Sequence, residues 1–339
     1  TMVNVSGAAT DSNNANGGSA WKSFRSPAGS RAEIRSTRVY LLTDGIETTL
    51  LLPDRCRDVY AFEDIIGLAM RISRERVSNL DLSALSFIEP YSMLSLLLLG
   101  RNHMRNTGER LGLVNIPLNI HQYLARMDFL SAGVFDVASR LDEKLLYRRS
   151  SFSNRVIEVT DIPGRERESV RAIAGVIAVF RKRARHILKY WLNTEIIDYF
   201  VTVISEVCQN IFEHSLDSGY LAMQTYSVGS EHVVRLVIMD SGIGIRESFS
   251  AREELASLAG SHVIEKALTT PISSKRRFGY GLCQVNAIIE KLKGSIYIRS
   301  GESSATVLHK QKQSGASHMF LRDDLAPFPG TQISISLFG

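Results

Sequence analysis

The sequence predicts an α/β protein built from two successive α/β units, and three observations support this prediction. Between residues 38 and 140, short apolar runs alternate with segments of helical periodicity, which is typical of an α/β layer. The same alternation starts again near residue 155 and continues to the last strand pattern. The chain has 339 residues, of which 44% are hydrophobic and 22% charged, so it can bury more than one core.

Composition also predicts the boundaries of these units. Residues 1–37 are rich in Gly, Ser, Asn and Ala and poor in large apolar residues, so burial cannot offset the entropy of ordering them. We therefore expect a disordered tail at 1–37, the first unit at 38–140, a linker at 141–154 and the second unit at 155–339.

Several functional classes are disfavoured by composition. The longest apolar runs, 93–99 and 172–180, are far shorter than the roughly 20 residues that cross a bilayer. Residues 1–20 are polar and lack the pattern of a signal peptide. We therefore expect a cytoplasmic protein without a membrane partner.

Cysteine and charge patterns give no strong functional signal. The three cysteines are isolated, without the paired spacing of a zinc site or a disulfide framework. The net charge is +5, and the densest basic run, 181–189, has no interleaved aromatic residues. A solvated helix face explains this run better than a nucleic-acid site, so nucleic acid is not expected as a partner.

In the first unit, the pattern predicts four strand regions and three helices. A turn at Asp44-Gly45 separates the first two strand runs, and Gly108 and Gly133 are expected to end two of the helices. The expected elements are strands at 39–42, 48–52, 77–88 and 111–116, and helices at 63–76, 91–106 and 120–133.

This unit resembles the STAS domain, the fold of bacterial anti-sigma factor antagonists. The resemblance lies in LDLSALSFIEPYSMLSLLLLGR, a strand followed by a turn and a helix, and in YLARMDFLSAG, which is similar to the last helix of that family. The family turn usually reads Asp-Ser-Ser-Gly, and a partner kinase phosphorylates its second serine. Here the turn reads Glu89, Pro90, Tyr91, Ser92, so the phospho-acceptor is absent and Ser92 is not expected to replace it.

The second unit begins with a strand in RVIEVTDIP and a helix over about 168–191. A second helix is predicted from Thr194 to His214, capped by Asn193 or Thr194. Two strands follow at 220–228 and 231–240, then a helix at 283–294, and finally the alternating run PGTQISISLF, which we expect to close the sheet as an edge strand.

The predicted helix 194–214 carries a column of polar residues in the stretch EVCQNIFEHS. Glu206, Asn210 and His214 recur every four positions, so they share one face of an α-helix. Taken alone, such a column indicates a solvent-facing stripe.

Three further motifs follow the column in the sequence. The strand ending at 240 runs directly into Asp-Ser-Gly-Ile-Gly, residues 240–244, and RRFGYGL at 276–282 opens the next helix. Gly330-Thr331 then enters the last strand. Each motif alone indicates only a turn or the start of an element, but glycines at such places let the backbone approach a ligand closely.

The order E-x-x-x-N, D-x-G-x-G, G-x-G-L and G-T resembles the GHKL superfamily of ATP-binding domains. That superfamily includes histidine kinases, anti-sigma serine kinases, DNA gyrase, heat-shock chaperones and mismatch-repair ATPases. The resemblance covers about 155–339. It implies an α/β sandwich, a mixed sheet with helices on one face, which binds ATP and Mg²⁺.

The resemblance also implies roles for individual residues. Asn210 matches the asparagine that holds Mg²⁺, and Glu206 matches the general base that acts on a water or a hydroxyl. Asp240 matches the aspartate that accepts a hydrogen bond from the adenine amine. Thr331 matches the threonine that helps to hold the base through water. For His214 we expect a packing or hydrogen-bonding role, and the alternative is that it helps to fix the waters of the metal.

The glycine motifs have implied roles as well. Gly242 and Gly244 let the loop pass beside the base, and Gly279, Gly281 and Leu282 form the motif on the phosphate side. The segment between Gly244 and Gly279 corresponds to the mobile lid of the family. It ends in Lys275, Arg276 and Arg277, which are either contacts for the γ-phosphate or a solvated loop.

The sequence therefore predicts a bacterial, cytoplasmic, Mg-ATP-binding regulatory protein. Two forms are favoured, an anti-sigma-type serine/threonine kinase and an ATP-dependent switch, with the STAS-like unit as a built-in partner for the ATP-binding unit. The alternatives are an ATPase whose lid drives a conformational or dimerisation cycle, and a non-catalytic nucleotide-binding scaffold. We also expect a protein partner, either a regulator or a phospho-acceptor. A homodimer is an open alternative.

Overall fold

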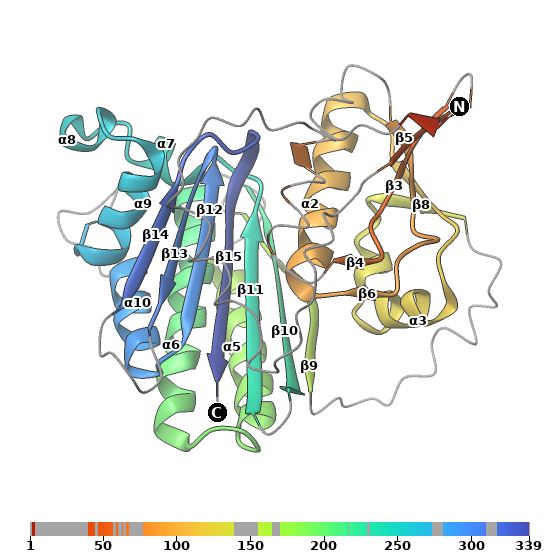
Figure 1. The fold of residues 1–339 in the computed structure, drawn as a ribbon. Coiled ribbons are helices and arrows are strands. Elements are labelled where there is room, and N and C mark those ends of the chain that lie inside the picture. The colour runs from red at the N-terminus through yellow and green to blue at the C-terminus, as the bar shows by residue number, and fades with distance from the viewer. Residues whose placement is uncertain are drawn as a thin grey trace.

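The computed structural model shows two α/β units that pack against each other (Figure 1). It describes residues 2–3, 40–44, 47–56, 59, 63, 66–67, 77–138, 155–164, 170–215, 217–228, 231–272, 281–309 and 317–338. Most of the predicted tail, most of the predicted helix 63–76 and the predicted linker lie outside these residues. The domain boundaries therefore stay a prediction.

The N-terminal unit consists of the described residues up to 138. Its elements are β1 (Met2–Val3), β2 (Tyr40–Asp44), β3 (Glu47–Leu51), β4 (Arg55–Cys56), β5 (Val77–Asp81), β6 (Phe87–Ile88), α2 (Pro90–Thr107), β7 (Leu111–Val114), α3 (Leu118–Arg126), the 3₁₀ turn η2 (Phe129–Ala132) and β8 (Phe135–Val137). In the described residues they form a sheet of order β1-β2-β3-β5-β7-β8, in which β3, β5, β7 and β8 run parallel.

The helix ends of this unit follow the glycine signals in the sequence. Gly108 adopts a left-handed conformation with φ of 77° and ends α2, as its position predicts. The predicted helix 120–133 is divided in two, because Asp128 has φ of 60° and starts the separate turn η2. That turn ends at Gly133, again in the left-handed region.

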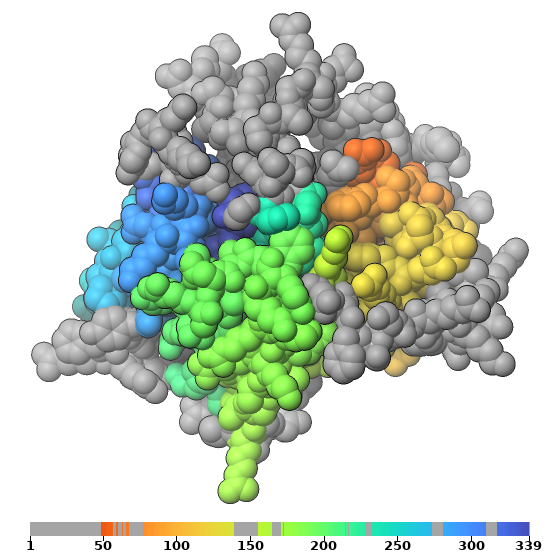
Figure 2. Space-filling view, turned by 90° about the horizontal axis from the view of Figure 1, so that it is seen from below, coloured from red at the N-terminus to blue at the C-terminus, as the bar shows by residue number. Residues whose placement is uncertain are grey.

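The C-terminal unit consists of the described residues from 155. Its elements are β9 (Val156–Ile162), α5 (Val170–Leu188), α6 (Thr194–Asn210), the π-helical turn η3 (Ile211–Ser215), β10 (Gly219–Val228), β11 (Glu231–Asp240), α7 (Gly244–Ser248), α8 (Glu253–Ala256), α9 (Gly260–Thr269), α10 (Gly281–Lys291), β12 (Ser295–Gly301), β13 (Ser303–Leu308), β14 (His318–Arg322) and β15 (Phe328–Phe338). The four longer helices α5, α6, α9 and α10 cover one face of the sheet (Figures 1 and 2). The predicted α/β class, with helices on one face, is confirmed.

The pairing within this sheet differs from the prediction in two respects. Its order is β14-β13-β12-β15-β11-β10-β9, and each neighbouring pair among the described strands is antiparallel, where a mixed sheet was predicted. The reason is the place of β15, which was predicted at an edge but lies between β11 and β12. Because β11 and β12 run in the same direction and β15 separates them, no parallel pair forms.

α2 is a central helix of the whole molecule. Each of its residues from Pro90 to Arg101 is buried, because the sheet of the N-terminal unit lies on one side and β10 and β11 lie on the other. Its leucines belong to a hydrophobic cluster that includes Tyr220, Val237 and Met239 of the second sheet. The two units therefore share a core. No helix in the described part of the chain has the length and apolar composition needed to cross a bilayer.

Candidate functional site

A cavity of about 390 Å³ lies between the helical layer and the sheet of the C-terminal unit. This size falls in the range of small-molecule sites. Its walls include residues from all four motifs, contributed by α6, the loop after β11, the start of α10 and β15. The lining residues predicted from the sequence are Glu206, Asn210, Asp240, Gly244, Gly281, Leu282 and Thr331.

The remaining predicted residues either do not line the cavity or lie outside the described part of the chain. Gly242 does not line the cavity but supports Asp240 from behind, through its backbone N–H. Lys275, Arg276, Arg277 and Gly279 lie outside the described residues. The predicted lid segment is in part a fixed element, because α9 is buried in the core through Val263, Ile264 and Leu268.

The α6 helix positions the first two polar residues of the column. It begins at an N-cap, where the Asn193 side chain accepts a hydrogen bond from the backbone N–H of Ile196 at 2.9 Å. It ends at Asn210, where the backbone widens into the π-helical turn η3, a feature often found at functional sites. The α-helical repeat that aligns Glu206 with Asn210 therefore does not continue to His214.

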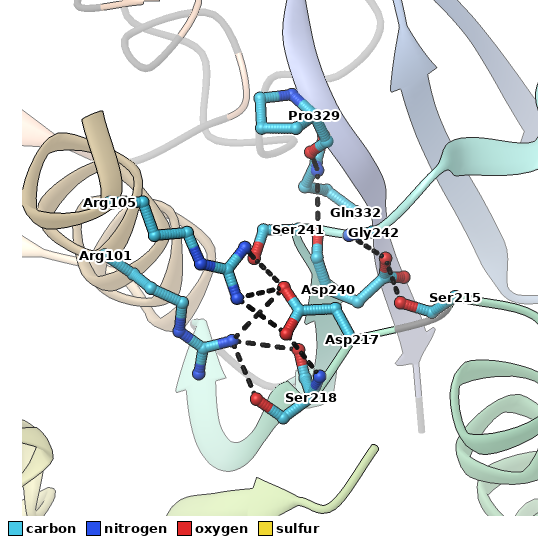
Figure 3. Close-up of polar contacts among 10 residues, drawn as sticks. All are labelled: Arg101, Arg105, Ser215, Asp217, Ser218, Asp240, Ser241, Gly242, Pro329 and Gln332. Atoms are coloured by element: carbon cyan, nitrogen blue, oxygen red, sulfur yellow. Dashed lines mark hydrogen bonds and ion pairs between the residues drawn. The ribbon is translucent and has the colours of Figure 1, made fainter. Parts of the chain in front are cut away.

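Asp240 forms the buried polar end of the cavity and is only 3% exposed. Its Oδ1 accepts hydrogen bonds from the Gly242 N–H and from the Ser215 hydroxyl, each at 2.8 Å. Its backbone carbonyl accepts a bond from the buried Gln332 side chain at 3.3 Å (Figure 3). Burial raises the pKa of Asp240 to about 6, although the donors Gly242 and Ser215 oppose this shift.

Gly242 is required by the close approach of two backbone segments. A Cβ at this position would lie 1.8 Å from the Ser215 carbonyl oxygen and 2.2 Å from its hydroxyl. A backbone carbonyl cannot move aside as a flexible side chain can, so only glycine fits here.

We expect Gly242→Ala to lower the free energy of unfolding by about 3 kcal/mol and to abolish ligand binding at Asp240. Urea denaturation and ligand titration measure the two effects. The matched control is Gly175→Ala on α5, where a Cβ would meet nothing within 4 Å and a gain of about 0.5 to 1 kcal/mol is expected. Equal stability of the two variants would contradict this account of the loop.

Asn210 also lines the cavity, where it lies against the first residue of α10. A Cβ on Gly281 would be 3.1 Å from Nδ2 and 3.3 Å from Oδ1 of Asn210, so glycine leaves room at this point. Within the described part of the chain, the Asn210 side chain forms no hydrogen bond, and α10 begins beside it at Gly281. A helix start and one amide oxygen suit a phosphate with a bound cation.

The donor set fits Mg²⁺ only when a ligand supplies further oxygens. Among the described residues, no group of three or more His, Cys, Asp or Glu side chains could hold a metal ion. Asn210 contributes one oxygen, so phosphate and water must complete the octahedral shell of Mg²⁺.

Hydrogen bonds of the Ser300 side chain connect two segments next to the cavity, and apolar residues form part of the cavity lining. Ser300 Oγ accepts the N–H of Ile245 at 2.8 Å, donates to the Gly330 carbonyl at 3.1 Å and lies 3.5 Å from Thr331 Oγ1. These bonds join the loop after β11 to the start of β15. The apolar lining is provided by Ile238, Ile245, Phe249, Ala267, Ile272 and Ile333, and it suits a flat aromatic group.

Comparison with known proteins agrees with this geometry. Residues 196–318 match the family model described as histidine kinase-, DNA gyrase B-, and HSP90-like ATPase. A GHKL-type ATPase domain is therefore present at residues 196–318. The match supports ATP as the ligand of this ATPase domain. No curated protein gave a match.

The matched residues span three of the four motifs and end before Gly330-Thr331. β9, α5 and β15 lie outside the match, yet β9 and β15 pair within the same sheet and α5 packs in the same core. Ser215, Ser300 and Gln332 were not predicted as site residues. Ser215 directly follows the polar column, which is the one signal that could have indicated it; Ser300 and Gln332 lie in ordinary alternating strands and give none.

Proposed function

We propose that the protein is a Mg-ATP-binding regulator, and that Asn210 and Asp240 mark the two ends of its nucleotide site. The observation that carries the proposal is their position at one cavity of about 390 Å³, with Gly281 and Thr331 in the same lining. Asp240 is suited to accept the adenine amine, and the N-terminus of α10 is suited to the phosphates. Asn210 would hold Mg²⁺ together with phosphate oxygens.

For the chemistry, we propose a serine/threonine kinase of the anti-sigma type acting in the cytoplasm. Glu206 lies one helical turn before Asn210 and lines the same cavity, so a carboxylate stands near the expected phosphates. A general base at this point suits a hydroxyl or water acceptor. The parallel strands of the N-terminal unit, with α2 after β5 and β6, support the STAS-like interpretation.

The acceptor hydroxyl is expected on another protein. Ser92, the nearest serine to the phosphorylation turn of STAS domains, is 0% exposed and lies within α2 at the centre of the molecule. It cannot reach a phosphate while the two units are packed together.

Labelled ATP distinguishes the possible activities. The protein is incubated with Mg²⁺ and γ-labelled ATP, alone and with the product of the neighbouring gene. Label transferred to protein supports the kinase, released phosphate an ATPase cycle, and binding without either a scaffold. A wild-type protein that binds no adenine nucleotide overturns the site assignment.

We expect Asn210→Ala to remove the dependence of ATP binding on Mg²⁺. Its affinity for Mg-ATP should fall about 10- to 100-fold, toward the value that the wild type shows in EDTA, because one charge-assisted contact is lost. Calorimetric titration with and without Mg²⁺ measures this effect. Asn106→Ala, at an exposed position of α2, is the matched control and should bind as wild type does. Undiminished Mg²⁺ dependence in Asn210→Ala would place the metal elsewhere.

A further inference from the structure

The C-terminal end of α2 reaches the segments that hold Asp240. Two arginines on successive turns of this helix, Arg101 and Arg105, extend to the segment 217–218 before β10 (Figure 3). The same cluster includes Ser241, the residue directly after Asp240. The N-terminal unit is thereby joined to the loop that carries the buried carboxylate of the site.

Arg105 and Ser241 converge on one carboxylate. Arg105 Nη2 lies 2.7 Å from Oδ1 and 2.6 Å from Oδ2 of Asp217, and its Nη1 lies 3.3 Å from Ser241 Oγ. Ser241 Oγ donates to Asp217 Oδ2 at 2.7 Å. The three side chains form a closed triangle, so displacing any one of them disturbs the other two.

Arg101 contacts the next residue of the same segment, Ser218. Its Nη1 donates to the Ser218 carbonyl at 2.9 Å and to the Ser218 hydroxyl at 3.1 Å. The guanidinium also lies 4.2 Å from the centre of the Tyr220 ring, within the range of a cation–π contact. The backbone that leads from η3 into β10 is thus fixed by α2.

Asp217 depends on these partners because its side chain is only 9% exposed. Burial opposes its ionisation, yet hydrogen bonds from Arg105, Ser241 and the Ser218 N–H hold its pKa below the ordinary value. Removing Arg105 from a buried, ionised Asp217 would cost free energy, so this cost keeps the two side chains paired.

Two segments next to Asp240 lie close to this network: the one that contains Ser215 and the loop that begins with Ser241. Ser215, which donates to Asp240 Oδ1, lies two residues before Asp217, and Ser241 follows Asp240 directly. Ser241 therefore contacts the ion pair directly, and Ser215 lies two positions from Asp217 along the chain. A shift of α2 would move the hydrogen-bond donor Ser215 together with the loop that begins with Ser241.

We propose that Asp217 and Arg105 are positioning residues for nucleotide recognition, through which α2 of the N-terminal unit sets the place of Asp240. This inference rests on the proposed ATP site. Neither residue lines the cavity, so they act through Ser215 and Ser241. Because coupling between two sites is reciprocal, bound ATP also strengthens the docking of α2 on β10.

The test compares two ion pairs that hold the two ends of α2. Arg105→Gln breaks the pair beside Asp240, and Glu89→Gln breaks the pair that Glu89 forms with Arg235 on β11, at the start of the helix. Both variants remove one charge between α2 and the sheet, so both should lose stability. Kd values for ATP and GTP are measured by calorimetric titration, and stability by urea denaturation.

We expect Arg105→Gln to raise the Kd for ATP about 10-fold with little change for GTP, because Asp240 selects adenine. Glu89→Gln should retain the wild-type ratio of the two Kd values, and Arg105→Lys should recover part of the loss. In the wild type, ATP should slow amide hydrogen exchange at 101–107 and 217–219, and this protection should be lost in Arg105→Gln.

Each other outcome has a distinct meaning. Equal loss of selectivity in Arg105→Gln and Glu89→Gln would show that only general docking matters, and it would overturn the positioning role. An unchanged ratio of Kd values in Arg105→Gln would overturn it as well. If the wild type binds neither nucleotide, the proposed function itself fails, which is a separate result from the failure of this inference.

Discussion

Replacing Asp240 by asparagine is expected to stabilise the protein while it weakens ATP binding about 10- to 100-fold. The side chain keeps an oxygen at Oδ1, where the Gly242 N–H and the Ser215 hydroxyl donate. An NH₂ group then replaces Oδ2, so a donor faces the adenine amine, which is itself a donor. The binding loss follows from this mismatch.

The gain in stability follows from the pKa of Asp240. Burial raises that pKa from 3.8 to about 6. Below about pH 4 the carboxyl is protonated in both states, and between about pH 4 and pH 6 the unfolded chain ionises first. The wild type therefore loses stability as the pH rises through this window, up to about 3 kcal/mol at higher pH. The amide of the Asp240→Asn variant does not titrate, so the variant avoids this cost.

Urea denaturation at pH 4 and pH 8, together with titration with ATP, checks both effects. The gain in unfolding free energy of Asp240→Asn should be present at pH 8 and small at pH 4. Asp198→Asn is the matched control, because Asp198 is exposed and pairs with Arg185 at the surface. A variant that is destabilised at pH 8, or that binds ATP like the wild type, would contradict the assigned role of Asp240.

Local features of the fold could be predicted because short-range physics sets them. The cap at Asn193 and the left-handed glycines at 108 and 133 depend on neighbouring residues only. The order of strands could not be read in this way. The run PGTQISISLF alternates as an edge strand does, yet β15 is central, because both of its edges pair with strands that lie far away in sequence, β11 and β12.

The lining of the cavity divides in the same manner. That Asn210, Asp240 and Gly281 share one lining could be predicted because a fixed order of motifs identifies them together. Ser215 and Ser241 are common residue types in turns, and their role depends on which segments meet in space. The network of Asp217 and Arg105 joins residues that are 112 positions apart, which periodicity does not reveal.

One signal in the sequence could have indicated the contact between the units. The run 93–99 in α2 is apolar except for Ser95, and a helix that is apolar nearly all round is buried on most sides. A single sheet covers only one side of a helix. The second covering layer is the outer face of the ATPase-domain sheet, through residues such as Val237 and Met239.

The largest kinetic effect is expected for Glu206→Gln. Glu206 lies one turn before Asn210 on α6, and both residues line the cavity. The carboxylate can therefore accept a proton from a hydroxyl or water that attacks the γ-phosphate. Glutamine keeps the size and the polar character of the side chain but cannot accept the proton. We expect the turnover rate to fall about 100- to 10,000-fold, while the Kd for Mg-ATP changes by less than about 2-fold.

Separating turnover from binding tests the assignment of Glu206. Phosphate release or transfer from γ-labelled ATP gives the rate, and calorimetric titration gives the Kd. Glu195→Gln, an exposed residue in the first turn of the same helix, is the matched control and should keep the wild-type rate. A Glu206→Gln protein with the wild-type rate would show that the general base lies elsewhere. Equal losses of rate and affinity would indicate that Glu206 instead binds the nucleotide or its metal ion.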